Sequence, residues 1–77
     1  MTIYKIETHD PISGYAYGKQ TFATLEAAKR WLSTLLRDVR DAGIAVREEE
    51  TEQSYEIAFC LGNMYYQYRV VSEYPIF

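Results

Sequence analysis

Two adjacent residues near the N-terminus, His9 and Asp10, are of the types that carry general acid–base chemistry. Such a pair needs a group that orients the histidine and a nucleophile or pocket beside it. The sequence identifies neither, and the Pro11 and Gly14 that follow are typical of a turn. We therefore interpret residues 9–14 as a loop and assign no catalytic role to His9.

Cys60 is the single cysteine, so it has no partner for an internal disulfide or a multi-cysteine zinc site. Its neighbours are apolar, without the basic cluster or helix N-terminus that activates a thiol, and we interpret it as a small apolar filler. The acidic residues do not follow the spacing of a calcium loop, and neither a glycine-rich phosphate loop nor a His/Cys metal pair is present. The sequence therefore predicts no cofactor, no metal and no enzyme activity.

Four carboxylates occur within five residues at residues 48–52, where a turn between two strands is expected. Such a run is often a solvated tip that keeps a sheet edge from aggregating. It also forms a local negative projection that can dock into a basic groove of a partner, including a groove that normally holds nucleic acid. Glu49, Glu50 and Glu52 are therefore candidate partner-binding residues.

The chain has 77 residues, about half of a typical domain, and predicts a single domain over residues 1–77. Eight Lys and Arg against eleven Asp and Glu give a net charge of −3, which disfavours direct nucleic-acid binding. Apolar runs are far shorter than a membrane-spanning helix, and the N-terminus does not resemble a signal peptide. We expect a cytoplasmic protein without membrane contact, in the host cytosol if a phage encodes it.

The elements that position these residues begin with strands at residues 3–7 and 15–22, the second weakened or bulged at Gly18. Thr24 is placed to cap a helix whose apolar residues recur at three- and four-residue steps, and Gly43 is placed to end it. From Ile44 the apolar period changes to two, which predicts strands at residues 44–50, 55–61 and 64–71.

Gly62 and Asn63 suit a two-residue hairpin turn between the last two strands. Pairing Leu61 with Met64 sets Phe59 opposite Tyr66 and puts the large apolar residues of both strands on one side. The same register predicts a pair between Glu56 and Arg69. When this register is extended to the strand predicted at residues 44–50, Val46 pairs with Ile57 and Arg47 pairs with Glu56. The extension predicts a row Arg47–Glu56–Arg69 across three strands.

This pattern predicts an α+β fold of two layers, an antiparallel sheet of about five strands with one helix on one face, in the order β-β-α-β-β-β. The uncovered face must meet water or a partner. Tyr65, Gln67 and Arg69 are expected there and are candidate partner-binding residues, whereas Tyr55, Tyr66 and Tyr68 are expected in the core. The alternation leaves open whether Tyr15 and Tyr17 belong to the core or to the surface.

The helix entry Phe22–Trp31, in a short, acidic, aromatic-rich chain, resembles small α+β proteins of phages and mobile elements, among them several anti-CRISPR proteins. The resemblance is one of layout and carries over no functional residue. It implies a stoichiometric inhibitor that binds a CRISPR effector complex and obstructs DNA recognition or nuclease recruitment.

We therefore predict a non-enzymatic inhibitor, anti-CRISPR-like, that acts by surface occlusion on a protein partner, as a monomer or homodimer. The partner would be a nucleic-acid-handling complex with a basic surface. The alternatives are a small adaptor or toxin–antitoxin-like module that self-associates through its sheet, and a single-strand RNA-binding module. The basic border and repeated exposed aromatics typical of RNA-binding sheets are not evident in the sequence.

Overall fold

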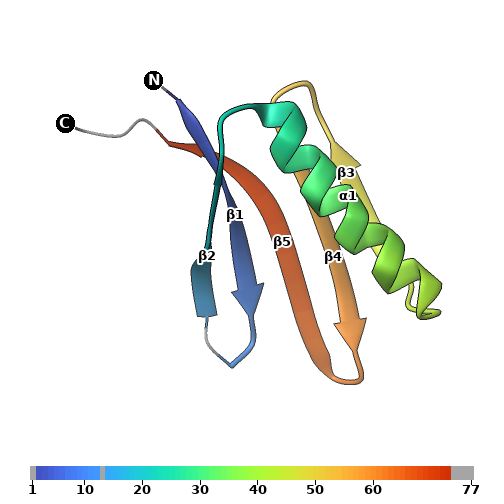
Figure 1. Cartoon of the computed structure of the whole chain (residues 1–77). Coiled ribbons are helices and arrows are strands. Elements are labelled where there is room, and N and C mark those ends of the chain that lie inside the picture. The colour runs from blue at the N-terminus through green and yellow to red at the C-terminus, as the bar shows by residue number, and fades with distance from the viewer. Residues whose placement is uncertain (1, 13, 74–77) are drawn as a thin grey trace.

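The computed structural model describes residues 2–12 and 14–73, with the side chain of Lys19 left aside. One helix packs on one face of a five-stranded antiparallel sheet, as the sequence predicts (Figure 1). The order across the sheet is β2-β1-β5-β4-β3. The elements are β1 (Ile3–Asp10), β2 (Gly14–Phe22), α1 (Leu25–Asp41), β3 (Val46–Glu50), β4 (Tyr55–Leu61) and β5 (Met64–Glu73).

Both ends of α1 form as predicted. The Thr24 hydroxyl accepts a hydrogen bond from the backbone N–H of Ala27 at 3.2 Å. At the other end Gly43 has φ +82°, and the N–H groups of Gly43 and Ile44 donate to the carbonyls of Arg40 and Val39. This Schellman motif satisfies carbonyls that the last helical turn would otherwise leave unpaired.

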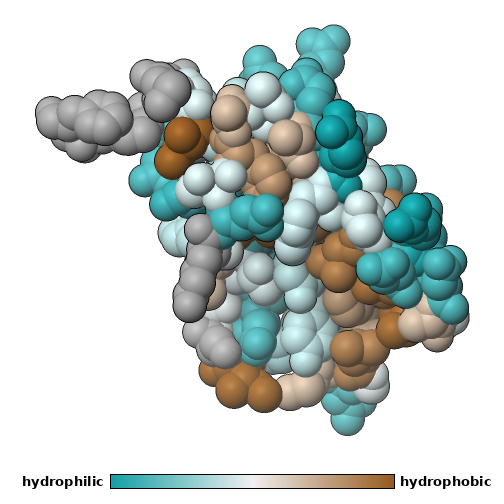
Figure 2. All heavy atoms as spheres, viewed as in Figure 1, coloured by the Kyte–Doolittle hydropathy of each residue, from teal (hydrophilic) through white to brown (hydrophobic). Residues whose placement is uncertain are grey.

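The core lies between α1 and the three central strands. Leu32 on the helix and Ile57 on β4 are fully buried. Phe59 stacks with Tyr66 at 5.6 Å and with Tyr68 at 6.0 Å between ring centroids. Figure 2 shows the helix side of the molecule, with hydrophilic side chains gathered along the outer flank of α1. The apolar stripe of the helix is therefore turned toward the sheet.

The β4–β5 register is confirmed, with Leu61 opposite Met64 and Phe59 opposite Tyr66. The register predicted for β3 is wrong by two residues, because Val46 lies opposite Phe59 and not Ile57. The β3–β4 turn is closed by Thr51, whose N–H donates to the carbonyl of Ser54 at 2.9 Å. The centre of this turn therefore lies one residue later in the chain than the predicted pairing of β3 with β4 requires. A shift of two residues keeps every side chain on its predicted face.

The loop predicted at residues 9–14 is also shorter in the structure. His9 and Asp10 belong to β1, and His9 pairs with Tyr15 of β2 and with Gln67 of β5. The Asp10 carboxylate accepts a hydrogen bond from the N–H of Ile12, which confines the turn to the residues after Asp10. Pairing with β2 and β5 holds β1 extended to His9, and pairing with Gly14 of β2 extends it to Asp10, so the strand ends just before Pro11.

Candidate functional site

The face of the sheet opposite α1, called here the open face, is the candidate site. Strand alternation assigns to it every second residue of each strand. The register places these residues there: Ile3, Lys5, Glu7, His9, Tyr15, Tyr17, Thr21, Arg47, Glu49, Glu56, Ala58, Cys60, Tyr65, Gln67, Arg69, Val71 and Glu73. The face therefore combines aromatic rings with both signs of charge.

Exposed tyrosine rings lie on the edge strand β2 and on the central strand β5 of the open face. Tyr15 and Tyr17 on β2 are 68% and 62% exposed, and Tyr65 on β5 is 39% exposed. The Tyr15 ring lies 4.6 Å from the ring of His9, and the Lys5 amine lies 5.8 Å from the centre of the Tyr17 ring. Tyr15 and Tyr17 therefore belong to the surface, which strand alternation had left open. Exposed aromatic rings also recur on this sheet, contrary to the expectation from the sequence.

Glu7 and Arg69 form an ion pair near the middle of the open face. Nε and Nη2 of Arg69 lie 2.8 and 2.7 Å from the same carboxylate oxygen of Glu7. The Glu7 side chain is only 11% exposed, whereas that of Arg69 is 51% exposed. The guanidinium is therefore fixed in place by its partner while much of it still faces solvent.

Two carboxylates face each other between β3 and β4 on the open face. Glu49 lies directly opposite Glu56. Neither carboxylate is within 4.0 Å of a cationic group among the residues that the structure describes. The predicted row Arg47–Glu56–Arg69 is therefore wrong, because the shifted register replaces Arg47 with Glu49. Like charges at directly opposite positions repel each other.

The acidic run is divided among three environments. Glu48 and Glu50 turn toward the helix side, where Glu48 accepts a hydrogen bond from the Tyr55 hydroxyl and Glu50 lies 3.2 Å from the Lys29 amine. Arg40 approaches Glu48 at 3.9 Å. Glu52 is exposed in the turn after β3, and Glu49 lies on the open face. The predicted negative projection is therefore reduced to Glu49 and Glu52, since helix cations partly neutralise the other two.

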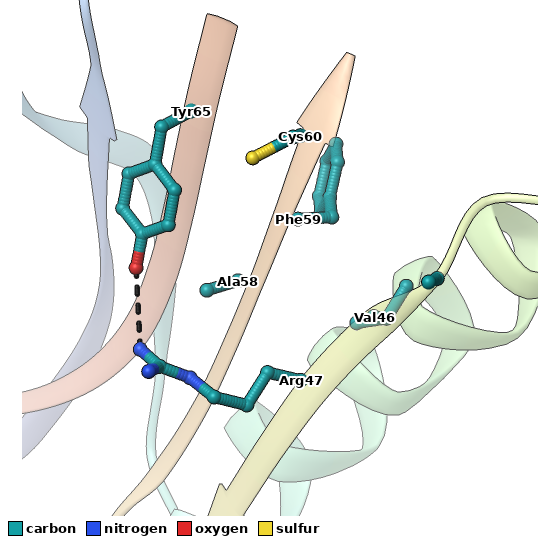
Figure 3. A pocket seen from close by; sticks show the side chains of 7 residues that line it. Val46, Arg47, Ala58, Phe59, Cys60 and Tyr65 are labelled. Atoms are coloured by element: carbon teal, nitrogen blue, oxygen red, sulfur yellow. Dashed lines mark hydrogen bonds between the residues drawn. The ribbon is translucent and has the colours of Figure 1, made fainter. Parts of the chain in front are cut away.

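A hollow of about 550 Å³ lies on the open face above β4 (Figure 3). The small side chains of Ala58 and Cys60 form its floor, between Tyr65 on β5 and Arg47 on β3. Arg47 Nη2 donates a hydrogen bond to the Tyr65 hydroxyl at 3.2 Å. Cys60 is exposed on the open face, the side of the sheet to which the alternation of β4 assigns it.

Of the predicted site residues, the structure brings Tyr65, Gln67, Arg69 and Glu49 together on the open face. It directs Glu50 to the helix side and leaves Glu52 in the turn. Sequence reasoning missed Glu56 as a site residue, although the alternation of β4 already placed it on this face. It could not find Glu7, because the Arg69 partner is 62 residues away in the chain.

Among the described residues, no group of three or more His, Cys, Asp or Glu side chains is arranged to hold a metal ion. Within the same part of the chain, no helix is long and apolar enough to cross a membrane. The described His9 Nδ1 is enclosed and has no hydrogen-bond partner that would orient the ring. Comparison with protein-family models, with curated proteins and with solved structures found no match for the chain.

Proposed function

We propose that this protein is a non-enzymatic protein-binding module whose open face docks on a partner protein. The observation that carries the proposal is the trio of exposed tyrosines on a sheet face that no other element covers within residues 2–12 and 14–73. Tyrosine presents a large contact area with few rotatable bonds and a polar hydroxyl, and it is enriched at protein interfaces. The Glu7–Arg69 pair adds a preorganised polar contact between them.

The partner surface is expected to be basic where it meets the Glu49–Glu56 pair of β3 and β4. Glu49 and Glu56 repel each other in the free protein, so a partner lysine or arginine between them relieves repulsion as it binds. The net charge of −3 favours the same encounter at long range. A surface with this property is found on complexes that handle nucleic acid.

The specific form that we propose is an inhibitor of the anti-CRISPR type, which occludes a basic surface of a CRISPR effector complex. The layout of the chain and its acidic, tyrosine-rich open face support this form. A self-associating adaptor would use the same face for a second copy of the chain, and a mass that rises with concentration in size-exclusion chromatography would favour it.

Single-strand RNA binding is the second candidate, because exposed tyrosines on an open sheet are a stacking surface. The charges of the open face disfavour RNA binding. Its described cations are Lys5, Arg47 and Arg69, and the first and last of these are held by Glu73 and Glu7. A groove that follows a phosphate backbone needs converging unpaired cations.

The test compares tagged wild-type protein with a Tyr15→Ser/Tyr17→Ser variant in a pull-down from host lysate, followed by mass spectrometry. The control is Trp31→Ser, which removes an aromatic ring that is 40% exposed on the helix. We expect the same identified proteins with the wild type and the control, and their loss with the tyrosine variant. Purified protein should also inhibit the identified complex in solution.

Equal capture by all three proteins would contradict the proposal that the open face is the docking surface. Tight binding of the purified wild type to single-stranded oligonucleotides at physiological salt would replace it with the RNA-binding function.

A further inference from the structure

The hollow on the open face has a chemical character of its own. The β4 part of its lining consists of the small side chains of Ala58 and Cys60 together with Phe59, while the neighbouring strands contribute Tyr65, Arg47 and Val46. Ala58 is only 4% exposed although no helix or strand of the described residues covers this face. The longer side chains opposite it, Arg47 and Gln67, therefore stand above it. The result is an apolar floor with a polar rim.

Arg47 differs from the other described cations of the open face. Lys5 lies 2.9 Å from Glu73 and Arg69 lies 2.7 Å from Glu7, whereas Arg47 has no carboxylate within 4.0 Å among the described residues. Its hydrogen bond to the Tyr65 hydroxyl holds the guanidinium at the rim of the hollow. A guanidinium has five N–H donors, so this bond leaves donors available for an anion.

We infer that the hollow receives a large apolar side chain of the partner protein, and that a carboxylate of the partner next to that side chain pairs with Arg47. The inference rests on the proposed docking of the open face on a protein, and it specifies the partner's chemistry. A buried apolar or aromatic anchor with a charge-assisted hydrogen bond at its rim is the usual composition of an interface hot spot.

The surrounding charges favour a single carboxylate over a nucleic-acid strand. Glu49 is two residues from Arg47 on the same face, and Glu56 lies opposite Glu49. One carboxylate can approach Arg47 from the hollow, but a chain of phosphates would have to pass this acidic pair.

The inference is tested by NMR titration of ¹⁵N-labelled protein with three blocked dipeptides, acetyl-Phe-Glu-amide, acetyl-Phe-Gln-amide and acetyl-Gly-Glu-amide. We expect the first to shift the amide signals of Arg47, Ala58, Cys60 and Tyr65 in a saturable manner. The second should bind about tenfold more weakly, because it lacks the charge that pairs with the guanidinium. The third lacks the apolar group and should cause no saturable shift.

Two variants separate the contributions of the hollow and of its rim. Cys60→Leu fills the hollow at an exposed position and should abolish binding of both phenylalanine peptides. Arg47→Gln should remove the preference for Glu over Gln, whereas Arg37→Gln, the same change on the exposed side of the helix, should retain it.

Absence of saturable shifts, shifts confined to other residues, or equal binding of the Phe-Glu and Phe-Gln peptides would overturn the inference. A decathymidine oligonucleotide that shifts the same amides more strongly than the Phe-Glu peptide would also overturn it. The proposed function is judged separately by the Tyr15→Ser/Tyr17→Ser pull-down. Loss of capture there, with no peptide binding at the hollow, leaves open-face docking in place and removes only the hollow as its anchor.

Discussion

Arg69 holds one carboxylate oxygen of Glu7 with two nitrogens, at 2.7 and 2.8 Å, across the pairing of β5 with β1. The Glu7 side chain is 11% exposed, so it depends on this partner more than a surface carboxylate would. The pair joins strands from opposite ends of the chain at the centre of the open face.

Replacement of Arg69 with Met should therefore lower the free energy of unfolding by about 1–2 kcal/mol, between the values of exposed and buried ion pairs. The matched control is Lys5→Met, which breaks the more exposed pair with Glu73 and should cost less than about 1 kcal/mol. Urea unfolding monitored by circular dichroism measures both. Equal losses would mean that burial of Glu7 adds nothing to the pair.

Phe59→Ala should cost about 3–5 kcal/mol, because the ring is 7% exposed and stacks with both Tyr66 and Tyr68. A loss of this size can unfold a domain of 77 residues. Tyr65→Ala should cost much less, since its ring lies on the open face. Thermal and urea unfolding of the two variants compare them directly, and similar stabilities would contradict the assignment of faces to β4 and β5.

Glu49→Gln should stabilise the protein by about 0.2–1 kcal/mol, because it removes the repulsion from Glu56 directly opposite. The gain should shrink at high salt, which screens exposed charges. Glu50→Gln is the control, since it weakens the contact with Lys29 and should give no gain. A lower stability of Glu49→Gln at low salt would show that Glu49 stabilises the free protein.

Alkaline pH should destabilise the fold through Tyr55 and Tyr68. Burial raises the pKa of Tyr55 above its ordinary value of 10.0, and the hydrogen bond to Glu48 raises it further. Burial also raises the pKa of Tyr68. Above about pH 10 the unfolded chain releases protons that the folded protein retains, so the free energy of unfolding falls as pH rises.

Tyr55→Phe tests this prediction, because it keeps the ring and removes the hydroxyl. The free energy of unfolding of this variant should fall less steeply between about pH 9 and pH 11 than that of the wild type. Identical slopes would mean that Tyr55 ionises equally in the folded and unfolded states.

Local patterns predicted the parts of this fold that are local in the chain. The capped helix follows from apolar spacing between Thr24 and Gly43, and the register of β4 and β5 follows from the two-residue turn at Gly62 and Asn63. The same turn gave the correct pair Glu56–Arg69. These features need only hydrogen bonds and contacts between residues near each other in the sequence.

The β3 register illustrates where the pattern becomes ambiguous. A shift of two residues leaves Val46 on the helix side and Arg47 on the open face, so hydrophobic alternation fits both registers equally well. The bonds between Thr51 and Ser54 in the turn select the observed one. The candidate site changed as a result, since Glu49 took the position opposite Glu56 that had been predicted for Arg47.

The sequence by itself determined which residues of β3, β4 and β5 face the helix and which face outward, because alternation along a strand is a local property. Only the tertiary structure decided which outward residues are neighbours outside the β4–β5 hairpin. It placed β5 beside β1, paired Glu7 with Arg69, and turned Glu48 and Glu50 toward the cations of α1. Strand order and ion pairing of this kind depend on packing between distant segments, and no periodicity within one segment encodes them.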